Sequence, residues 1–407
     1  MTVEYNTKNS PELQLDYKIP VAVLGATGTV GQKILLLLAN HPWFQVIRLC
    51  ASEQSAGKTY AEAAHWIQNE PIPEAYREMR VENCAAPPLV NTADTRVATA
   101  QGNSGTFPPG QACRIAFSAL DANVAGPIEE TWAQASVTVI SNARNHRMRS
   151  DVPLIVPEVN PEHLAIVEAQ PYPAPGCIIT NPNCSTIGLV LALKPLQDAF
   201  GLDAVQVVTM QAISGAGYPG VSALDIMDNV IPYISGEEEK LEKEVIKILG
   251  KLKSGTGGNR ASDPTDSSSI PGVDYAGFSV SASCHRVPVL DGHLESVSFK
   301  LKSKADPKTI IEAWENFSHD SLRSSLPLQR APLRYLYEQE RPQPRLDRGT
   351  GSGMTVSIGR LRPCSVLDWK FEVLVHNTIR GAAGGTVLLG ELYAKEAGLI
   401  EGIAKLA

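Results

Sequence analysis

Hydrophobic and polar positions follow two different patterns along this chain. Up to about residue 180, short apolar runs rich in β-branched residues alternate with stretches of helical periodicity. Helical stretches are predicted at residues 32–40 and 187–196. Strands that alternate with helices indicate an α/β domain with a parallel, Rossmann-type sheet. We expect its strands at residues 19–24, 46–50, 114–120, 137–141 and 177–180.

From about residue 205 apolar positions alternate with polar ones, which is typical of an antiparallel sheet with one buried face. A charged amphipathic helix is predicted at residues 237–252, followed by a loop rich in Gly, Ser, Asp and Pro at 256–274. The last helix, at residues 384–399, begins in a glycine-rich turn. The second half is therefore expected to be α+β, with strands at residues 206–211, 295–301, 354–360 and 370–375.

The two patterns predict two domains, because 407 residues are too many for one ordinary core. We place the first domain at residues 1–182 and the second at 183–375, with residues 376–407 packing back on the first. Residues 58–110 are expected to be an elaborated excursion from the first domain, to which the sequence assigns no role. The polar residues 1–17 are expected to be frayed.

Composition excludes several classes of function. The chain has 36 basic and 43 acidic residues, and its net charge of -7 offers no general attraction to nucleic acid. Its apolar runs are too short to span a membrane, and its polar N-terminus lacks a signal-peptide pattern. The seven cysteines are scattered without metal-ligand spacing, which favours a reducing, cytoplasmic compartment and predicts neither disulfides nor a metal site.

Glycines at positions 25, 28 and 31 stand between the first strand and the first helix. In dinucleotide-binding folds such glycines allow a tight turn, close approach of a pyrophosphate and close packing of helix on strand. The spacing is GxxGxxG rather than GxGxxG, so a glycine-rich turn without a ligand stays open as an alternative.

The segment after the second strand bears on which dinucleotide would bind. An acidic residue there reads the ribose of NAD, whereas small polar or basic groups accommodate the 2′-phosphate of NADP. Ser52, Ser55 and Lys58 are suited to hold that phosphate, and Glu53 would oppose it if it pointed inward. The segment favours NADP and leaves NAD open.

The stretch TNPNCSTIG at residues 180–188 puts Cys184 where a strand gives way to an apolar helical run. Unpaired N–H groups and the positive end of the helix dipole at such a position favour the thiolate, which is the nucleophilic form. The alternative is that Cys184 is a small buried hydrophobe, as most lone cysteines are. The flanking Asn, Ser and Thr explain a turn and a helix cap, but not the thiol.

A nucleophilic thiol beside a dinucleotide site suggests chemistry on an acyl group. The sulfur would hold the acyl chain as a thioester, and a nicotinamide would exchange hydride at its carbon. This chemistry needs an acid or base near the thiol. Among eight histidines, His285 and His293 stand out because they lie between two strands of the second domain, and Gly292 allows close backbone approach beside His293. For each of these two histidines, an ordinary structural role at the surface or in the core is an equally good interpretation.

Eight segments along the chain together have a recognisable order: GATGTVG at 25–31, ASEQSAGK at 51–58, SNARNHRMRSDVPLIVPEVN at 141–160, the cysteine turn, QAISGAGYPG at 211–220, GEEEKLEKEVIKIL at 236–249, RVPVLDGH at 286–293 and HNTIRGAAGG at 376–385. In sequence and in order they resemble segments of the aspartate-semialdehyde dehydrogenases, and among them the archaeal and fungal type. The resemblance covers almost the whole chain. It implies a Rossmann-type dinucleotide-binding domain followed by a catalytic and dimerisation domain similar to that of glyceraldehyde-3-phosphate dehydrogenase.

The resemblance implies roles for the residues that carry the chemistry. Cys184 would be the nucleophile, His293 the general acid/base, and Gln211 would orient the intermediate. Arg286 would bind a substrate carboxylate, a bidentate task that suits guanidinium. The remaining substrate contacts would be Arg147 and Lys240 for phosphate with Asn142 nearby, Glu237 for the substrate amino group, and Asn183 beside the thiol. Without the resemblance, Glu237 and Lys240 would be taken as a surface ion pair in a charged helix.

The resemblance also implies NADP as the cofactor, with NAD possible. Gln54 departs from the family, because many members carry Arg there to hold the 2′-phosphate, and this weakens the preference for NADP. The implied cofactor-binding residues are Gly25, Thr27, Gly28, Thr29, Val30, Ser52, Ser55, Ser118, Ser214, Gly215 and Asn377.

The implied reaction is the NADPH-dependent reductive dephosphorylation of 4-phospho-L-aspartate to L-aspartate 4-semialdehyde, a step of lysine, threonine and methionine biosynthesis. The implied partners are aspartyl phosphate, phosphate and further copies of the chain in a homodimer or homotetramer. A malonyl-CoA reductase would form the same thioester, so it stays open. N-acetyl-glutamyl-phosphate reductase is less favoured because its cysteine turn differs. A silent cofactor-binding protein is disfavoured because the cysteine, histidine, glutamine and arginine are all retained.

Overall fold

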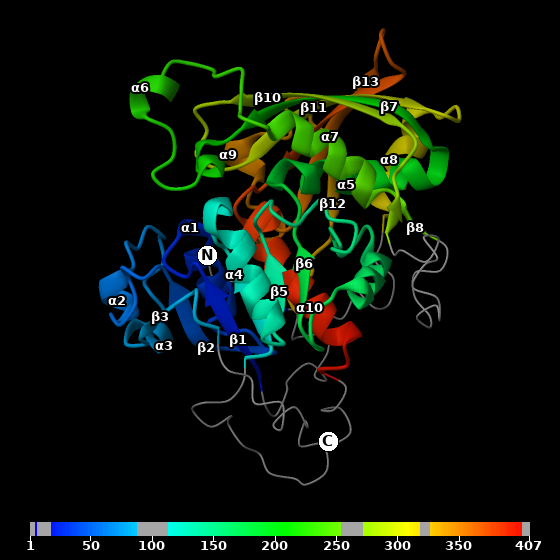
Figure 1. Cartoon of the computed structure of the whole chain (residues 1–407). Coiled ribbons are helices and arrows are strands. Elements are labelled where there is room, and N and C mark those ends of the chain that lie inside the picture. The colour runs from blue at the N-terminus through cyan, green and yellow to red at the C-terminus, as the bar shows by residue number, and fades with distance from the viewer. Residues whose placement is uncertain (1–4, 6–17, 88–112, 254–271, 318–325, 401–407) are drawn as a thin grey trace, which may run out of the picture.

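The computed structural model describes residue 5 and residues 18–87, 113–253, 272–317 and 326–400 of the chain. The described residues contain two six-stranded sheets. In the view of Figure 1 the second sheet lies above the first, with helices between and beside them. Most of the frayed segment predicted at 1–17 and the part of the excursion at 88–110 lie outside the described residues.

The first sheet is parallel throughout, with the strand order β3-β2-β1-β4-β5-β6. This is the doubly wound order of dinucleotide-binding folds, and it confirms the α/β prediction. Five strands were expected from the apolar runs; the short strand β3 lies inside the excursion and was missed. The strands are β1 (Ile19–Leu24), β2 (Phe44–Ala51), β3 (Val81–Asn83), β4 (Ile115–Ser118), β5 (Thr138–Ser141) and β6 (Cys177–Thr180).

Helices cover both faces of the first sheet. Because side chains alternate along a strand, Val21 and Val23 of β1 face one side, and Ala22 and Leu24 face the other. The valines pack in one core with α1 (Thr29–Leu38) and α10 (Gly384–Glu396), and the other pair packs with α4 (Ala122–Gln134). Helix α10 thus lies against the first sheet, although it follows the second sheet in sequence (Figure 1).

The second sheet has the order β10-β7-β11-β14-β13-β12. The four strands expected from alternation form its centre, and each is antiparallel to its neighbour. Strands β10 and β12 were not predicted; they pair in parallel with β7 and β13, so the sheet is mixed. The strands are β7 (Leu202–Gln211), β10 (Ser279–Arg286), β11 (His293–Leu301), β12 (Leu333–Leu336), β13 (Val356–Pro363) and β14 (Trp369–Val375).

Three helices, α5 (Cys184–Phe200), α7 (Glu237–Ile248) and α8 (Pro307–Glu315), pack with one face of the second sheet in a single core. The charged helix was predicted to continue to residue 252, which is wrong. It ends at Ile248, and β8 (Lys251–Leu252) pairs with β9 (Val273–Asp274). Gly250 permits this, because a Cβ there would lie 2.5 Å from the Asp274 carbonyl oxygen. The rest of the predicted loop, 256–271, lies outside the described residues.

The other elements are short: α2 (Tyr60–Ala63), α3 (Glu74–Arg77), α6 (Ala223–Ile226), α9 (Pro344–Asp347), and turns of 3-10 or π type at Pro161–Ala169, Ile213–Ala216, Thr350–Gly353 and Ile379–Ala383. Within the described ranges, no helix combines the length and apolarity needed to cross a membrane.

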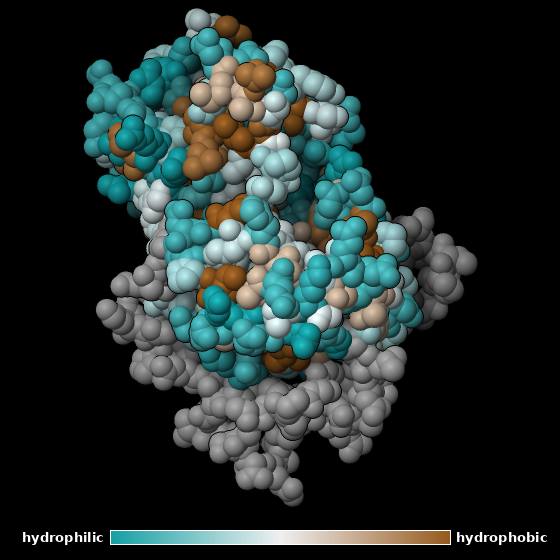
Figure 2. Space-filling model, turned by 90° about the vertical axis from the view of Figure 1, so that its left-hand side faces the viewer, coloured by the Kyte–Doolittle hydropathy of each residue, from teal (hydrophilic) through white to brown (hydrophobic). Residues whose placement is uncertain are grey.

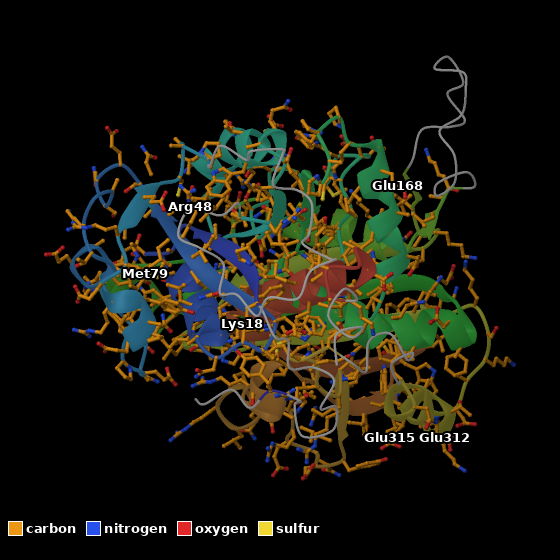
Figure 3. All side chains as sticks on the ribbon, turned by 90° about the horizontal axis from the view of Figure 1, so that it is seen from below. Lys18, Arg48, Met79, Glu168, Glu312 and Glu315 are labelled. Atoms are coloured by element: carbon orange, nitrogen blue, oxygen red, sulfur yellow. The ribbon has the colours of Figure 1, made fainter. Side chains whose placement is uncertain are left out.

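The carboxyl ends of the first sheet's strands point toward the second sheet. Strand β6, for example, leads from its carboxyl end within three residues into α5, which packs on the second sheet. In the view from below, Lys18, which precedes β1, and Arg48 of β2 lie to the left of Glu312 and Glu315, which belong to α8 of the second core (Figure 3). Ligands of doubly wound sheets bind beyond the carboxyl ends of the strands. The region between the two sheets is therefore where a site is expected.

We predict that Gly390→Ala lowers the free energy of unfolding by about 1–2 kcal/mol, because a Cβ on Gly390 of α10 would meet the ring of Phe117 in β4 at 2.4 Å. The gain in helix propensity offsets only part of that overpacking. Urea denaturation would measure it, with Gly277→Ala as the control, since nothing lies within 4 Å of a Cβ there. Equal stability of the two variants would contradict the packing of α10 on this sheet.

Candidate active site

Cys184 is the first residue of α5, and this confirms the prediction of a cysteine at a helix start. The first sheet ends at Thr180 of β6, and three residues of turn lead into the helix. Asn183 caps the helix, because its side-chain oxygen accepts from the Ser185 N–H at 2.9 Å. The cysteine keeps partial exposure, whereas its neighbours Asn183 and Ser185 are buried.

His293 lies against the thiol: its Nε2 is 3.2 Å from Cys184 Sγ. The other ring nitrogen, Nδ1, accepts from the Ala212 N–H at 3.0 Å. This hydrogen bond orients the ring and requires that a neutral imidazole carry its proton on Nε2. A donor N–H therefore points at the sulfur.

The surroundings hold both members of this pair in their neutral forms. Burial, reinforced by the Glu237 carboxylate, raises the pKa of Cys184 to about 12, against the opposing effects of Arg147, Arg286 and the Ser185 N–H. Burial, with Arg286 and His376, lowers the pKa of His293 to about 3. The Ser185 N–H at the helix start does favour the thiolate, as expected, but desolvation has the larger effect, so the thiol of the free enzyme stays protonated.

Three strands bring Arg286 and Gln211 to the same edge as His293. Gln211 ends β7, Arg286 ends β10, and the two residues are paired in register; His293 begins the neighbouring strand β11. Gly215 fits closely between them, since a Cβ there would lie 2.9 Å from Arg286 Nη1 and 3.1 Å from His293 Nε2. His285, the other histidine that the sequence singled out, faces the opposite side of β10 from Arg286.

Helix α7 presents charged side chains to the site. Glu237 is buried, and its Oε1 accepts from Asn183 Nδ2 at 2.6 Å and from Gln211 Nε2 at 3.4 Å. Its Oε2 accepts from Lys240 Nζ at 3.0 Å. The i,i+3 pair is therefore part of the site rather than a surface ion pair. Burial alone would raise the pKa of Glu237. The positive charge of Lys240 and the hydrogen bonds from Lys240, Asn183 and Gln211 lower that pKa instead.

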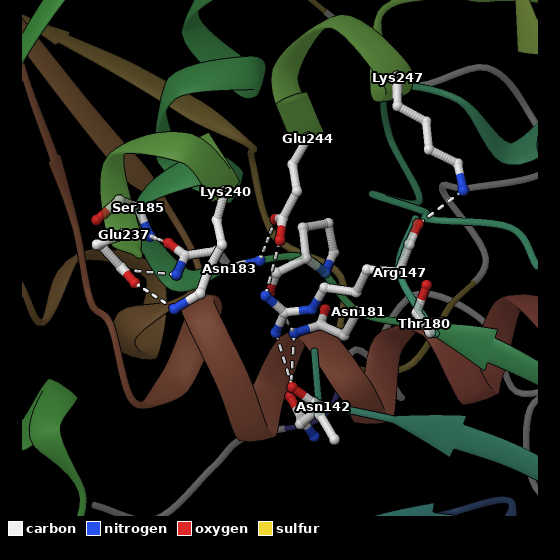
Figure 4. A network of polar contacts seen from close by, with 12 residues as sticks. Asn142, Arg147, Thr180, Asn181, Asn183, Ser185, Glu237, Lys240, Glu244 and Lys247 are labelled. Atoms are coloured by element: carbon white, nitrogen blue, oxygen red, sulfur yellow. Dashed lines mark hydrogen bonds and ion pairs between the residues drawn. The ribbon is translucent and has the colours of Figure 1, made fainter. Parts of the chain in front are cut away.

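Arg147 and Asn142 lie together at the end of the first sheet (Figure 4). Arg147 donates through Nη2 to the Asn142 carbonyl oxygen at 2.7 Å and through Nη1 to Glu244 Oε1 at 2.9 Å. Asn142 in turn accepts from Asn181 Nδ2 at 3.1 Å. These contacts connect the segment after β5 to the turn that carries Cys184.

The turn Ile379–Ala383 closes the site from the C-terminal side. A Cβ on Gly381 would lie 2.6 Å from Cys184 Cβ, so only glycine fits there. The same turn packs against α1, the helix that follows the glycine turn. Asn377, just before it, donates to Ser214 Oγ at 2.8 Å and accepts from the Gly292 N–H at 2.8 Å. Ser214, Gly215 and Asn377 therefore lie beside His293.

The glycine turn between β1 and α1 has the features of a dinucleotide site. Gly25 has φ +75°, and a Cβ on Gly31 would lie 2.2 Å from the Gly25 carbonyl oxygen. Gly28 is the N-cap residue and gives no side-chain cap to α1. Thr29 Oγ1 is buried and has no hydrogen-bond partner among the described residues. Uncapped N–H groups and an unpartnered hydroxyl fit a pyrophosphate at this helix start.

The remaining residues assigned to the cofactor are placed differently. Thr27, which accepts from Gln32 Nε2 through its carbonyl, and half-buried Val30 belong to the same turn. Ser52, Gln54 and Ser55 follow β2 in a partly exposed turn. The end of β2 lies beside the glycine turn, because the N–H groups of Gly25 and Ala26 both donate to the Cys50 carbonyl oxygen. Ser118 is not open to a ligand, because its hydroxyl is buried and donates to Glu129 Oε1 at 2.6 Å.

Sequence reasoning missed four residues that structure the site: Asn181, Glu244, Lys247 and Gly381. The signal for two of them was present. Glu237, Lys240, Glu244 and Lys247 are spaced by three, four and three residues, which puts them on one face of a helix. Glu244 and Lys247 are each 1 % exposed, so this face of the helix is buried and not solvated.

This fold and this site define a class: semialdehyde dehydrogenases with an NAD-binding domain and a dimerisation domain. The model of the semialdehyde dehydrogenase NAD-binding domain matches residues 20–109 and 96–167, and that of the dimerisation domain matches residues 193–380.

More specifically, the chain belongs to the aspartate-semialdehyde dehydrogenases. It is 44 % identical to that of Candida albicans, with 91 % of this chain and 96 % of the relative covered, and 43 % identical to that of Archaeoglobus fulgidus, with 92 % and 98 % covered. The crystal structure of the Candida albicans enzyme with NADP superposes with a TM-score of 0.76 at 40 % identity and covers 94 % of this chain and 99 % of that one.

We predict that alkylation of Cys184 by iodoacetamide accelerates about tenfold per pH unit from about pH 7 to about pH 10, because the thiolate fraction rises in this way below a pKa of about 12. Mass spectrometry in a Cys364→Ser background would follow it, since Cys364 is the other cysteine that is not buried. A plateau below about pH 9, as for an ordinary free thiol, would contradict the raised pKa.

Proposed function

We propose that this chain reduces 4-phospho-L-aspartate to L-aspartate 4-semialdehyde, with release of phosphate, and that the acyl group passes through a thioester on Cys184. The observation that carries the proposal is the contact of 3.2 Å between Cys184 Sγ and His293 Nε2. The site around this contact contains three basic residues, Arg147, Lys240 and Arg286. Such a site suits an acyl substrate with two anionic groups.

The cofactor proposed is NADP, with the pyrophosphate at the uncapped start of α1 and Ser52 and Ser55 beside the ribose. When bound, NADPH supplies the hydride that reduces the acyl carbon. The Candida albicans relative, whose structure was solved with NADP, supports this choice. Gln54 offers no charge to a 2′-phosphate, and this leaves NAD as a weaker alternative.

In the acylation step, the Cys184 sulfur attacks the carbonyl carbon of the acyl phosphate and an S–C bond forms. The C–O bond to phosphate breaks with its electron pair on the departing phosphate, which takes up the proton that the thiol loses. Arg147 and Lys240 would receive that phosphate. The His293 Nε2–H points at the sulfur, so it can stabilise the thiolate while it attacks and again while the reduced intermediate collapses to the aldehyde.

The rest of the substrate is proposed to bind where the ends of the paired strands β7 and β10 face the start of helix α7. Arg286 donates through Nη1 to the Ala212 carbonyl oxygen at 2.8 Å, and its other guanidinium N–H groups would bind the α-carboxylate. Glu237, which stays ionised, would bind the amino group. Gln211, next to both, would orient the intermediate. Asn183 keeps Glu237 in place through its hydrogen bond of 2.6 Å.

The acyl phosphate is preferred to an acyl-CoA as donor. Arg147, Lys240 and Glu237 are assembled around the thiol, and malonyl-CoA has no amino group for Glu237 to bind. The relatives that share 43–44 % of the sequence are aspartate-semialdehyde dehydrogenases and not malonyl-CoA reductases. N-acetyl-glutamyl-phosphate reductase and a silent cofactor-binding protein have no supporting observation.

We also propose that the chain is a cytoplasmic homodimer, or a tetramer of two such dimers, joined through the second domain. The match to the dimerisation domain supports association. The loop around α6 exposes Tyr218, Leu224, Met227 and Tyr233, and the face that carries it shows hydrophobic surface in its upper half (Figure 2). All seven cysteines are free, as a reducing compartment requires. The proposed domain division at residues 182 and 183 would put the glycine turn in the first domain and Cys184 with His293 in the second.

The reaction can be tested in reverse with aspartate semialdehyde, phosphate and NADP, by following the absorbance of NADPH. We expect phosphate-dependent reduction of NADP and a slower reaction with NAD. Cys184→Ala should abolish turnover and leave the affinity for NADP unchanged. Turnover of malonyl-CoA with NADPH at a higher kcat/KM, or normal turnover in Cys184→Ala, would overturn the proposal.

His293→Asn is expected to lower turnover about a hundredfold or more, because asparagine lacks the imidazole N–H that is placed to stabilise the thiolate during attack and departure. Cys184 should still be alkylated by iodoacetamide in that variant. His285→Asn, on the opposite side of β10, should keep turnover within about twofold. If both variants lost the same activity, the proposed role of His293 would fail.

A further inference from the structure

Glu244 has no part in the reaction as described so far, yet it is almost fully buried between two parts of the site, the Arg147 guanidinium and the turn before Cys184. It lies on α7 and is 1 % exposed. One oxygen, Oε1, accepts from Arg147 Nη1 at 2.9 Å, and the other, Oε2, accepts from the main-chain N–H of Asn183 at 2.7 Å (Figure 4). Asn183 directly precedes the nucleophile and caps its helix.

The chemistry of the two partners requires a carboxylate at this position. Both partners are donors, and they approach different oxygens of the same group. Only an ionised carboxylate has two acceptor oxygens and no donor, whereas an amide would turn an N–H₂ toward one of the two N–H groups. A buried donor left without its acceptor costs free energy, so the pair of bonds fixes the position of Glu244.

Arg147 is held through both terminal nitrogens of its guanidinium and through its backbone. Its Nη2 donates to the Asn142 carbonyl oxygen at 2.7 Å, and its Nε has no partner among the described residues. Lys247, one turn along α7, donates to the carbonyl oxygens of Arg147, Arg149 and Val152 at 2.7, 2.8 and 3.0 Å. The guanidinium and its backbone are therefore both fixed to α7.

The charges of the site are balanced in pairs. Arg147 is matched by Glu244 at 2.9 Å, and Lys240 by Glu237 at 3.0 Å. Each of the two basic groups assigned to phosphate thus already has a carboxylate. A phosphate that binds there gains less electrostatic energy than it would from two unpaired cations, because each carboxylate repels it.

We propose that Glu244 is a positioning residue of the phosphate site: by joining Arg147 to the Asn183 N–H, it fixes the oxyanion-binding guanidinium relative to the nucleophile, and its charge keeps phosphate affinity low. The inference rests on the proposed function, because it needs Arg147 to bind phosphate. It predicts that loss of this charge tightens phosphate binding while it slows the reaction. A residue that only supported the fold would not produce that combination.

The test compares Glu244→Gln with Glu239→Gln, an exposed carboxylate on the same helix. In Glu244→Gln we expect the dissociation constant for inorganic phosphate to fall about tenfold, because the carboxylate that repels phosphate is lost. We expect kcat to fall about tenfold or more, because Arg147 and the Asn183 N–H lose their common acceptor. Phosphate affinity is measured by its protection of Cys184 from iodoacetamide, which requires no turnover, and again as KM. Glu239→Gln should change neither value by more than about twofold.

Glu244→Asp keeps the charge and both acceptors on a shorter side chain, so it should lower kcat and leave phosphate affinity unchanged. This variant decides the question if Glu244→Gln does not fold, which its thermal transition would show. Phosphate affinity that is unchanged or weaker in Glu244→Gln, or wild-type kcat in Glu244→Asp, would overturn the inference. If phosphate neither protects Cys184 nor supports turnover in the wild type, it is the proposed function that fails.

Discussion

The start of helix α5 is the point on which the rest of the site depends. Cys184 stands there between the end of the parallel sheet and the second domain, and each group that acts on it comes from a different element. Strand β11 brings His293 to 3.2 Å from the sulfur, and α7 holds the Asn183 N–H through Glu244. The close approach of Gly381 fixes the cysteine from the third side. The nucleophile is thus positioned by packing and not by its own turn alone.

The same burial that positions the thiol also determines its charge. A cysteine at an exposed helix start would be expected to ionise easily, but here the desolvation cost outweighs the effects of Arg147, Arg286 and the Ser185 N–H, and the pKa rises to about 12. The surrounding acids and bases are balanced in pairs, Arg147 with Glu244 and Lys240 with Glu237. Arg286 donates instead to the neutral carbonyl oxygen of Ala212, so the site keeps a positive charge for an anionic group of the substrate.

Much of the fold could be predicted from local patterns, and the exceptions have physical reasons. Apolar runs identified five strands of the first sheet, and the alternation of apolar and polar positions identified four of the second, because a buried strand face must present apolar side chains at fixed spacing. The short strand β3 and the edge strands β10 and β12 carry too few buried positions for that signal. Helix α7 was expected to continue to residue 252, but Gly250 ended it and allowed β8 to pair with β9.

The sequence by itself determined the doubly wound sheet, the glycine turn, the cysteine at a helix start and, through its motifs, the family of the chain. What it could not decide is which charged residues are buried, because burial of Glu244 and Lys247 depends on what packs against α7 from residues about a hundred positions away. Ionisation of Cys184 and the partner of Ser118 were decided in the same way. Helical spacing puts side chains on one face, but only tertiary contacts establish whether that face meets water or another part of the chain.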